Sequence, residues 1–319
     1  MEESKKVIGQ QYSNAAMRGE LNKLIKDIAK QMRPQAALRI GISENELNKS
    51  LSVSLGMNDE INAYADRRGH YIVINGSLMI YYHKMLKVYC ATLSVGDKAT
   101  NHMYKPSIHP ERIASIMKKL LAADLENKLL LTKALDGVEL NRAQIVVLTR
   151  LVHSCECFAV GHEMGHIIIS RTKSNIMEME AAKKIVEEFL EPIKELKDNE
   201  KKELLEPWTE EFCADLIGLQ LTLSIPEVEP YKHWGNYKSW LCSGAEISRS
   251  LDMMMQEYKD RLNNGKLVTF VNTHPHDYLR LQAIRGSQDY IDAKGIPWFG
   301  ESFSVFSKVI DFVLGIGEK

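Results

Sequence analysis

Two histidines four residues apart, with a glutamate between them, constrain this chain more than any other feature of its sequence. In an α-helix, positions i and i+4 lie on one face, so His162 and His166 can hold one zinc ion together, with Glu163 at the flank of that face. Apolar residues from 144 to 170 predict one long or once-broken helix around this motif, and Ile167–Ile169 indicates that it is buried. The alternative is an ordinary buried helix whose histidines are capped by carbonyl groups.

A second segment can supply the third protein ligand that a catalytic zinc site normally has. Residues 208–219 carry apolar side chains at helical spacing, and Pro207 before them suits a helix start. Glu211 and Asp215 are four residues apart and share one face of this helix. We expect Glu211 to complete the zinc ligands and Asp215 to orient a ligand imidazole. The alternative is a solvated acidic face, which is the position expected for Glu210.

Four short motifs, in this order, resemble those of the M48-like zinc peptidases, which include the Ste24 and HtpX-type proteases. The motifs are Asn-Ala-Tyr-Ala at 62–65 with the segment 69–78 after it, His-Glu-x-x-His at 162–166, Glu-Phe-x-Ala-Asp at 211–215, and Thr-His-Pro at 273–275 followed by Arg280. The chain is also similar, more weakly, to the Lit-type phage-exclusion peptidases in length and motif position. The resemblance implies a zincin-like metallopeptidase fold and the hydrolysis of peptide bonds.

A short β-branched run, Tyr71–Ile74, predicts a strand that ends in a turn at Asn75–Gly76. The resemblance makes this the edge strand beside the zinc helix, where a peptide substrate can add as a further strand. It implies substrate contacts for Asn62, Ile72 and Ile74. A plain structural strand, with turn chemistry at Asn62, is the alternative.

The late motif places His274 before Pro275, which stiffens the chain at this point. A fixed imidazole here can donate a hydrogen bond to the oxyanion that forms on the scissile carbonyl group. The alternative is a capping or core histidine. Arg280, six residues further on, is expected to form a structural ion pair with an acidic group of the fold.

The composition favours a globular protein of the cytosol. A net charge of −1 gives no sign of nucleic-acid binding, and five cysteines without framework spacing indicate reduced thiols. The charged start, residues 1–6, is unlike a secretory signal. The apolar stretch 71–95 is interrupted by His83, Lys84 and Lys87, so we expect no transmembrane segment, in contrast to the membrane-embedded members of the family. The oligomeric state is left open.

These patterns predict a predominantly helical α+β fold with a small sheet. Residues 1–55 are expected to form an N-terminal helical segment packed on a catalytic unit, residues 56–319. Two helical insertions interrupt that unit, near 84–140 and 171–206. The second has the charge pattern of a helical hairpin, which could be a lid over the site or a solvated brace.

Together, these expectations predict a soluble zinc endopeptidase with one zinc ion per chain. Zinc lowers the pKa of its water from 15.7 toward about 7, and Glu163 accepts the proton as general base. The expected partner is a peptide or protein substrate. A catalytically silent or regulatory protein-binding module on the same scaffold is the alternative. The intact Glu163 counts against that alternative, because a pure binder does not need a general base.

Overall fold

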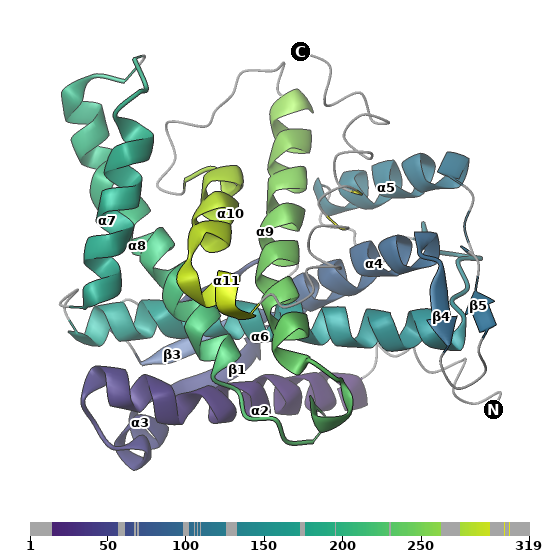
Figure 1. Ribbon diagram of the computed structural model, residues 1–319, viewed down its shortest axis with the longest axis horizontal. Coiled ribbons are helices and arrows are strands. Elements are labelled where there is room, and N and C mark those ends of the chain that lie inside the picture. Colours follow the sequence, from purple (N-terminus) through teal and green to yellow (C-terminus); the bar gives the residue numbers. More distant parts are fainter. Residues whose placement is uncertain are drawn as a thin grey trace.

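A long helix, α6 (Arg142–Thr172), runs through the middle of the computed structural model and carries both histidines (Figure 1). It is continuous over the whole segment 144–170 for which the sequence predicts a helix. The structure describes residues 15–56, 61–66, 68, 70–97, 102–104, 106, 108, 110–125, 133–172, 176–194, 196–229, 231–262, 275–293, 303 and 306.

The described part of the chain is predominantly helical, with five short strands. Besides α6, its elements are α2 (Ala15–Ile40), α3 (Glu44–Ser50), β1 (Ser52–Gly56), β2 (Ala63–Ala65), β3 (Tyr71–Asn75), α4 (Gly76–Thr92), β4 (Val95–Asp97), β5 (His102–Tyr104), α5 (Pro110–Leu125), α7 (Met177–Leu190), α8 (Asp198–Leu223), the 3₁₀ turn η2 (Tyr231–His233), α9 (Tyr237–Leu262), α10 (Asp277–Gly286) and α11 (Gln288–Ala293). This confirms a predominantly helical fold with a small sheet.

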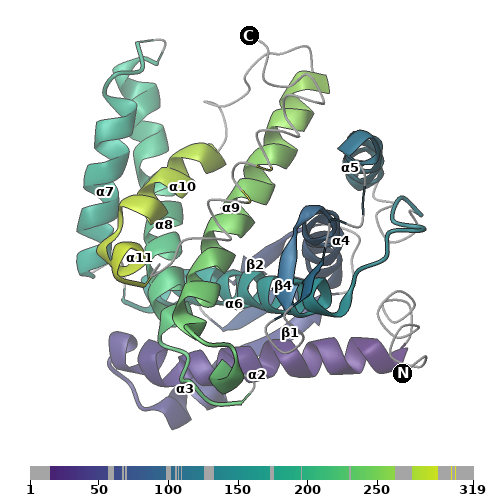
Figure 2. The same cartoon turned by 45° about the vertical axis from the view of Figure 1, so that its right-hand side comes forward.

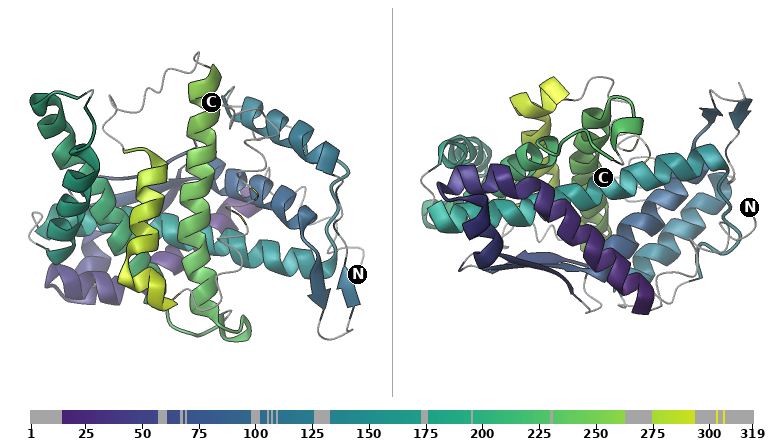
Figure 3. Two further views of the ribbon diagram at one scale, coloured as in Figure 1. Left: turned by 45° about the horizontal axis from the view of Figure 1, so that its top comes forward. Right: turned by 90° about the horizontal axis from the view of Figure 1, so that it is seen from below.

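The main sheet has three strands, and β3 is the central one. β1 pairs with β3 in parallel and β2 pairs with it antiparallel, so the prediction that Tyr71–Asn75 is an edge strand is wrong. The side chains of Ile72 and Ile74 are fully buried, whereas the side chain of Tyr71 is exposed to solvent. This alternation arises because helices α2 and α6 cover one face of the sheet (Figure 3).

The predicted turn after β3 is absent, because the strand runs directly into α4. Asn75 is both the last residue of the strand and the N-cap residue of the helix, with extended backbone angles. Asparagine is favoured at N-caps and in turns alike, so Asn75–Gly76 is compatible with either structure. The helix that follows is buried over most of its length.

The N-terminal segment packs on the rest of the molecule through α2, which contacts α6 and β1. Gly41, with a φ of 78°, follows the last residue of α2, a position that favours glycine. The chain then continues through α3 into β1, which belongs to the same sheet as β3. The expected boundary between residues 55 and 56 therefore falls inside a strand.

In the described part of residues 171–206, α7 and the first part of α8 lie side by side, which agrees with the helical hairpin that the sequence predicts (Figures 1 and 2). The prediction that a new helix starts at Pro207 is wrong, since α8 begins at Asp198 and passes through this proline. The buried side chains Leu204 and Trp208, on either side of it, hold the two halves of α8 against the core. Packing therefore overrides the local cost of a proline inside a helix.

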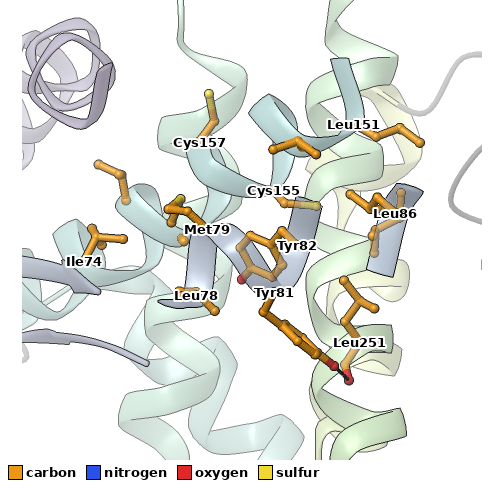
Figure 4. Packing of buried hydrophobic residues seen from close by; sticks show 14 of the residues in the cluster. Ile74, Leu78, Met79, Tyr81, Tyr82, Leu86, Leu151, Cys155, Cys157 and Leu251 are labelled. Atoms are coloured by element: carbon orange, nitrogen blue, oxygen red, sulfur yellow. Dashed lines mark hydrogen bonds between the residues drawn. The ribbon is translucent and has the colours of Figure 1, made fainter. Parts of the chain in front are cut away.

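The core lies between α4, α6 and α9. Tyr81 and Tyr82 of α4 are almost fully buried, and Tyr82 lies next to Cys155 of α6 (Figure 4). The hydroxyl group of Tyr81 donates a hydrogen bond of 3.0 Å to the carbonyl oxygen of Leu251 on α9. This buried bond joins two segments that are far apart in the sequence.

By length and composition alone, α6 is apolar enough to cross a membrane. However, 67% of its most apolar 18-residue window is buried inside the protein by the surrounding helices. That burial is typical of the core helix of a soluble protein.

Candidate metal centre

Helix α6 presents the two histidines and the glutamate from its buried half. His162 and Glu163 are buried, and His166, one turn later, is partly exposed. The Nε2 atoms of the two imidazoles lie 3.2 Å apart. The helical spacing seen in the sequence thus brings both rings to one point.

Glycines allow α8 to approach this part of α6 very closely. A Cβ atom on Gly161 would lie 2.6 Å from the carbonyl oxygen of Gly218, and one on Gly165 would lie 2.8 Å from that of Ala214. Only a residue without a side chain fits at such distances. The close crossing brings Glu211 of α8 up to the imidazoles.

The three side chains lie close enough together to share one metal ion, with one ligand atom of each within 4.8 Å of the others. Glu211 Oε2 lies 3.6 Å from His162 Nε2, and Glu211 Oε1 lies 3.6 Å from His166 Nε2. Zinc bonds of about 2.0–2.2 Å in a tetrahedron separate neighbouring ligand atoms by about 3.3–3.6 Å. These three residues fit one metal ion, and three protein ligands leave a fourth position for water or substrate.

Two carboxylates contact the other nitrogen of each ring. Asp215 Oδ1 lies 2.9 Å from His162 Nδ1, as the sequence suggested for an orienting group. Glu210 Oε1 lies 3.3 Å from His166 Nδ1, although its side chain is 49% exposed. Glu210 was expected to be solvated only. Such contacts hold each ring with Nε2 turned toward the metal position.

Arg280 of α10 forms the expected structural ion pair, and it does so with the metal-site helix α8. Its Nε and Nη2 atoms donate to the two oxygens of Asp215 at 2.7 and 2.8 Å. Nη2 also lies 3.2 Å from Glu211 Oε2. One guanidinium group thereby fixes both Glu211 and Asp215.

The charges of the site are strongly perturbed by burial and by one another. Burial raises the pKa of Glu163 to about 7, against the opposing charge of His166. Burial lowers the pKa of His162 to about 4, which favours the neutral ring that a metal requires. Burial disfavours charge on Asp215 as well, but Arg280 outweighs it and holds the pKa of this carboxyl well below its usual range.

His166 behaves differently from His162. Burial acts to lower its pKa, but the hydrogen bond with Glu210 and the charge of Glu211 outweigh burial and raise the pKa to about 9. Without a metal, the acidic groups around the site therefore hold a proton on this ring. A cation is favoured at this position.

The residues predicted to contact substrate are placed elsewhere. Ile72 and Ile74 are fully buried in the central strand β3, whose two sides are already paired, so neither can receive an added peptide strand. Asn62 accepts a hydrogen bond from the side chain of Asn75, and its carbonyl oxygen accepts one from the Asn75 N–H at 3.1 Å. Asn62 is thus bonded to the end of β3, thirteen residues along the chain, which is a structural role but not the turn chemistry given as the alternative. His274 lies outside the described residues.

Two further charged residues of this cluster were not expected from the sequence. Asp277 lies one turn before Arg280 on α10, and its Oδ1 atom is 3.7 Å from Arg280 Nη1. Arg249 of α9 contacts the same oxygen at 3.3 Å. The i,i+3 spacing of Asp277 and Arg280 is a signal that sequence reasoning could have used. Nothing in the sequence singles out Arg249.

No family model, no curated protein and no solved structure matches this chain. Its chemistry must therefore be inferred from its own residues.

Proposed function

We propose that this protein is a zinc-dependent endopeptidase. The observation that carries the proposal is the convergence of His162, His166 and Glu211, whose ligand atoms lie within 4.8 Å of one another, with the buried carboxyl group of Glu163 on the same helix as the histidines. Zinc, when bound, acts as a Lewis acid and makes water nucleophilic near neutral pH.

The side chains around the metal position then have distinct tasks. Glu163 accepts a proton from the attacking water and returns it to the leaving amine. A pKa near 7 suits both steps, because the carboxyl group can gain and lose the proton at neutral pH. Asp215 and Glu210 keep the two imidazoles aligned.

The balance of charge in the described residues also favours a divalent cation. The ionic cluster around the site contains four carboxylates, those of Glu211, Asp215, Asp252 and Asp277, but only two guanidinium groups, those of Arg249 and Arg280. In the absence of a metal, the proton on His166 supplies a third positive charge, so the carboxylates of this cluster outnumber its cations by one. Uncompensated charge away from bulk water is costly, and Zn²⁺ would neutralise it.

A peptide substrate could be held at the edge of the sheet formed by β2. In the part of the chain that the structure describes, β2 is paired only on its β3 side, and it contacts α6. Backbone groups of an extended peptide can pair with such an edge independently of the peptide's sequence. We place the protein in the cytosol, where its five free and buried cysteines remain reduced.

The test combines metal content with hydrolysis of an unfolded protein such as casein. The purified protein should contain one zinc ion per chain and cleave this substrate. Glu163→Gln keeps the size and hydrogen bonding of the side chain but removes the base, so it should retain zinc and lose about 10²–10⁴-fold in turnover. Glu156→Gln is the matched control, because Glu156 is buried on the same helix but contacts His153 rather than the metal position.

Two results would contradict the proposal. A protein that neither contains zinc nor takes it up has no metal centre of this kind. A protein that binds zinc but whose hydrolysis is the same in the parent and in Glu163→Gln is not a peptidase of this mechanism, and a binding module on the same scaffold would then be the better description.

A further inference from the structure

A buried arginine of α9 lies at the far end of the charge cluster that holds the metal ligands. Arg249 is 7% exposed, and its ion pairs are with residues other than the three proposed zinc ligands. Its Nη2 atom lies 3.2 Å from Asp252 on its own helix, and its Nη1 atom lies 3.3 Å from Asp277 on α10. The guanidinium group is thus shared between two acidic residues.

Asp277 links Arg249 to the metal centre. The same Oδ1 atom that contacts Arg249 also lies 3.7 Å from Arg280, which holds Asp215 and Glu211 on α8. Asp277 therefore competes with Glu211 and Asp215 of α8 for Arg280. In the structure Arg280 lies closer to α8, since it is 2.7 Å from Asp215 and 3.7 Å from Asp277.

We infer that Arg249 is a positioning residue for the metal ligand Glu211. By neutralising Asp277, it leaves the guanidinium group of Arg280 directed at Asp215 and Glu211. Without Arg249, the uncompensated Asp277 would draw Arg280 toward itself, and Glu211 would lose the contact that fixes its carboxylate. The inference rests on the proposed zinc site. It assigns a positioning role to a residue that is not one of the three proposed zinc ligands.

Two other roles for Arg249 predict different results. If Arg249 only pins α9 to α10, its loss should resemble the loss of Arg285, which joins the same two helices through Glu246. If Arg249 acts only as a nearby positive charge, its removal should strengthen zinc binding, because a repelling cation is lost. A positioning role predicts weaker zinc binding. The direction of the change in zinc affinity therefore distinguishes the three roles.

The experiment measures the zinc dissociation constant by competition with a chromophoric chelator. Arg249→Gln should bind zinc about tenfold more weakly, at the low end of what is typical for residues behind the ligands. Arg285→Gln, the matched control, should bind zinc as the parent does. Urea unfolding of both variants without zinc measures how much free energy of unfolding is lost with each ion pair between α9 and α10.

A double-mutant cycle tests the route through Asp277. Asp277→Asn removes the competitor, so adding Arg249→Gln in the D277N background should cause no further loss of zinc affinity. This comparison also serves if Arg249→Gln alone does not fold, because the double variant lacks one of the two carboxylates that Arg249 neutralises.

Equal or tighter zinc binding by Arg249→Gln, or a tenfold loss that persists in the D277N background, would overturn the inference. Both results are distinct from failure of the proposed function, in which the parent protein itself would bind no zinc.

Discussion

At the scale of single residues, the metal centre depends on side chains that each serve two partners. Arg280 contacts both Asp215 and Glu211, and Asp215 contacts both Arg280 and His162. A change at one of these residues therefore alters more than one contact. The energetic effect of a substitution should follow the burial of the groups left without a partner.

The two carboxylates behind the histidines should differ in importance. Asp215→Asn removes the charge that pairs with buried Arg280, so we expect a 10–100-fold loss of zinc affinity and a destabilisation of about 3–5 kcal/mol. Glu210→Gln should have a smaller effect on both, because the Glu210 side chain is half-exposed and screened by water. Zinc titration and urea unfolding of both variants measure this. A larger loss for Glu210→Gln would show that the role of Asp215 is misassigned.

Part of the site could be predicted from the sequence because its residues repeat at helical spacing. His162 with His166, and Glu211 with Asp215, are pairs four residues apart, and this spacing alone places each pair on one face. Which faces meet is decided by the packing of α6 on α8. The contact of Glu210 with His166 depends on that packing, and the contact of Arg249 with Asp277 depends on the packing of α9 on α10, so the local sequence carries no signal for either.

His83 on α4 should make the protein less stable in mild acid. Burial, together with the charges of Lys87 and Lys84, lowers the pKa of His83 to about 4 in the folded state, compared with about 6.5 in the unfolded chain. Between these values the unfolded chain binds more protons, so stability falls as the pH drops through this window. We expect a loss of about 2 kcal/mol from this group between pH 7 and pH 5.

The measurement is urea unfolding at both pH values, with EDTA present so that zinc is absent throughout. His83→Gln should lose about 2 kcal/mol less than the parent over this interval, because it lacks the group that takes up the proton. An identical pH dependence in both proteins would exclude His83 as the cause.

At the scale of elements, the crossing of α6 and α8 should tolerate no added side chain. Gly161→Ala places a methyl group 2.6 Å from a backbone oxygen of α8, so we expect a destabilisation of about 1–3 kcal/mol and weaker zinc binding, since Glu211 is pushed from the histidines. Gly19→Ala is the control, because no atom lies within 4 Å of the added group and helix α2 should gain up to about 1 kcal/mol. Equal effects of the two substitutions would contradict a tight crossing.

The elements themselves were only partly predictable. The helix over 144–170 and the hairpin at 171–206 follow from apolar periodicity, which is a local property. The central position of β3 does not follow from the local sequence. A run of β-branched residues looks the same whether one edge of the strand or both edges are paired. The continuation of α8 through Pro207 likewise depends on the burial of Leu204 and Trp208, which only the tertiary structure determines.

At the scale of the whole molecule, a bound metal would join helices from three separate stretches of the chain. The histidines lie on α6, Glu211 lies on α8, and Arg280 of α10 holds α8 in place. Because α6 also contacts α2, α4 and α9, the centre is connected to most of the core. Binding at such a point should be linked to global unfolding and not to a local loop alone.

Zinc should therefore stabilise the folded protein as a whole. At a free concentration one hundred times its dissociation constant, a single zinc ion adds about 2.7 kcal/mol to the free energy of unfolding. Hydrogen exchange should show the added protection first in α6, α8 and α10, and less in α5, which packs on α4 and α9 away from the ligands. In His166→Ala, which lacks one ligand, neither effect should occur. If zinc stabilised His166→Ala as much as the parent, the metal would be acting at another position, and the centre on α6 and α8 would not be its binding site.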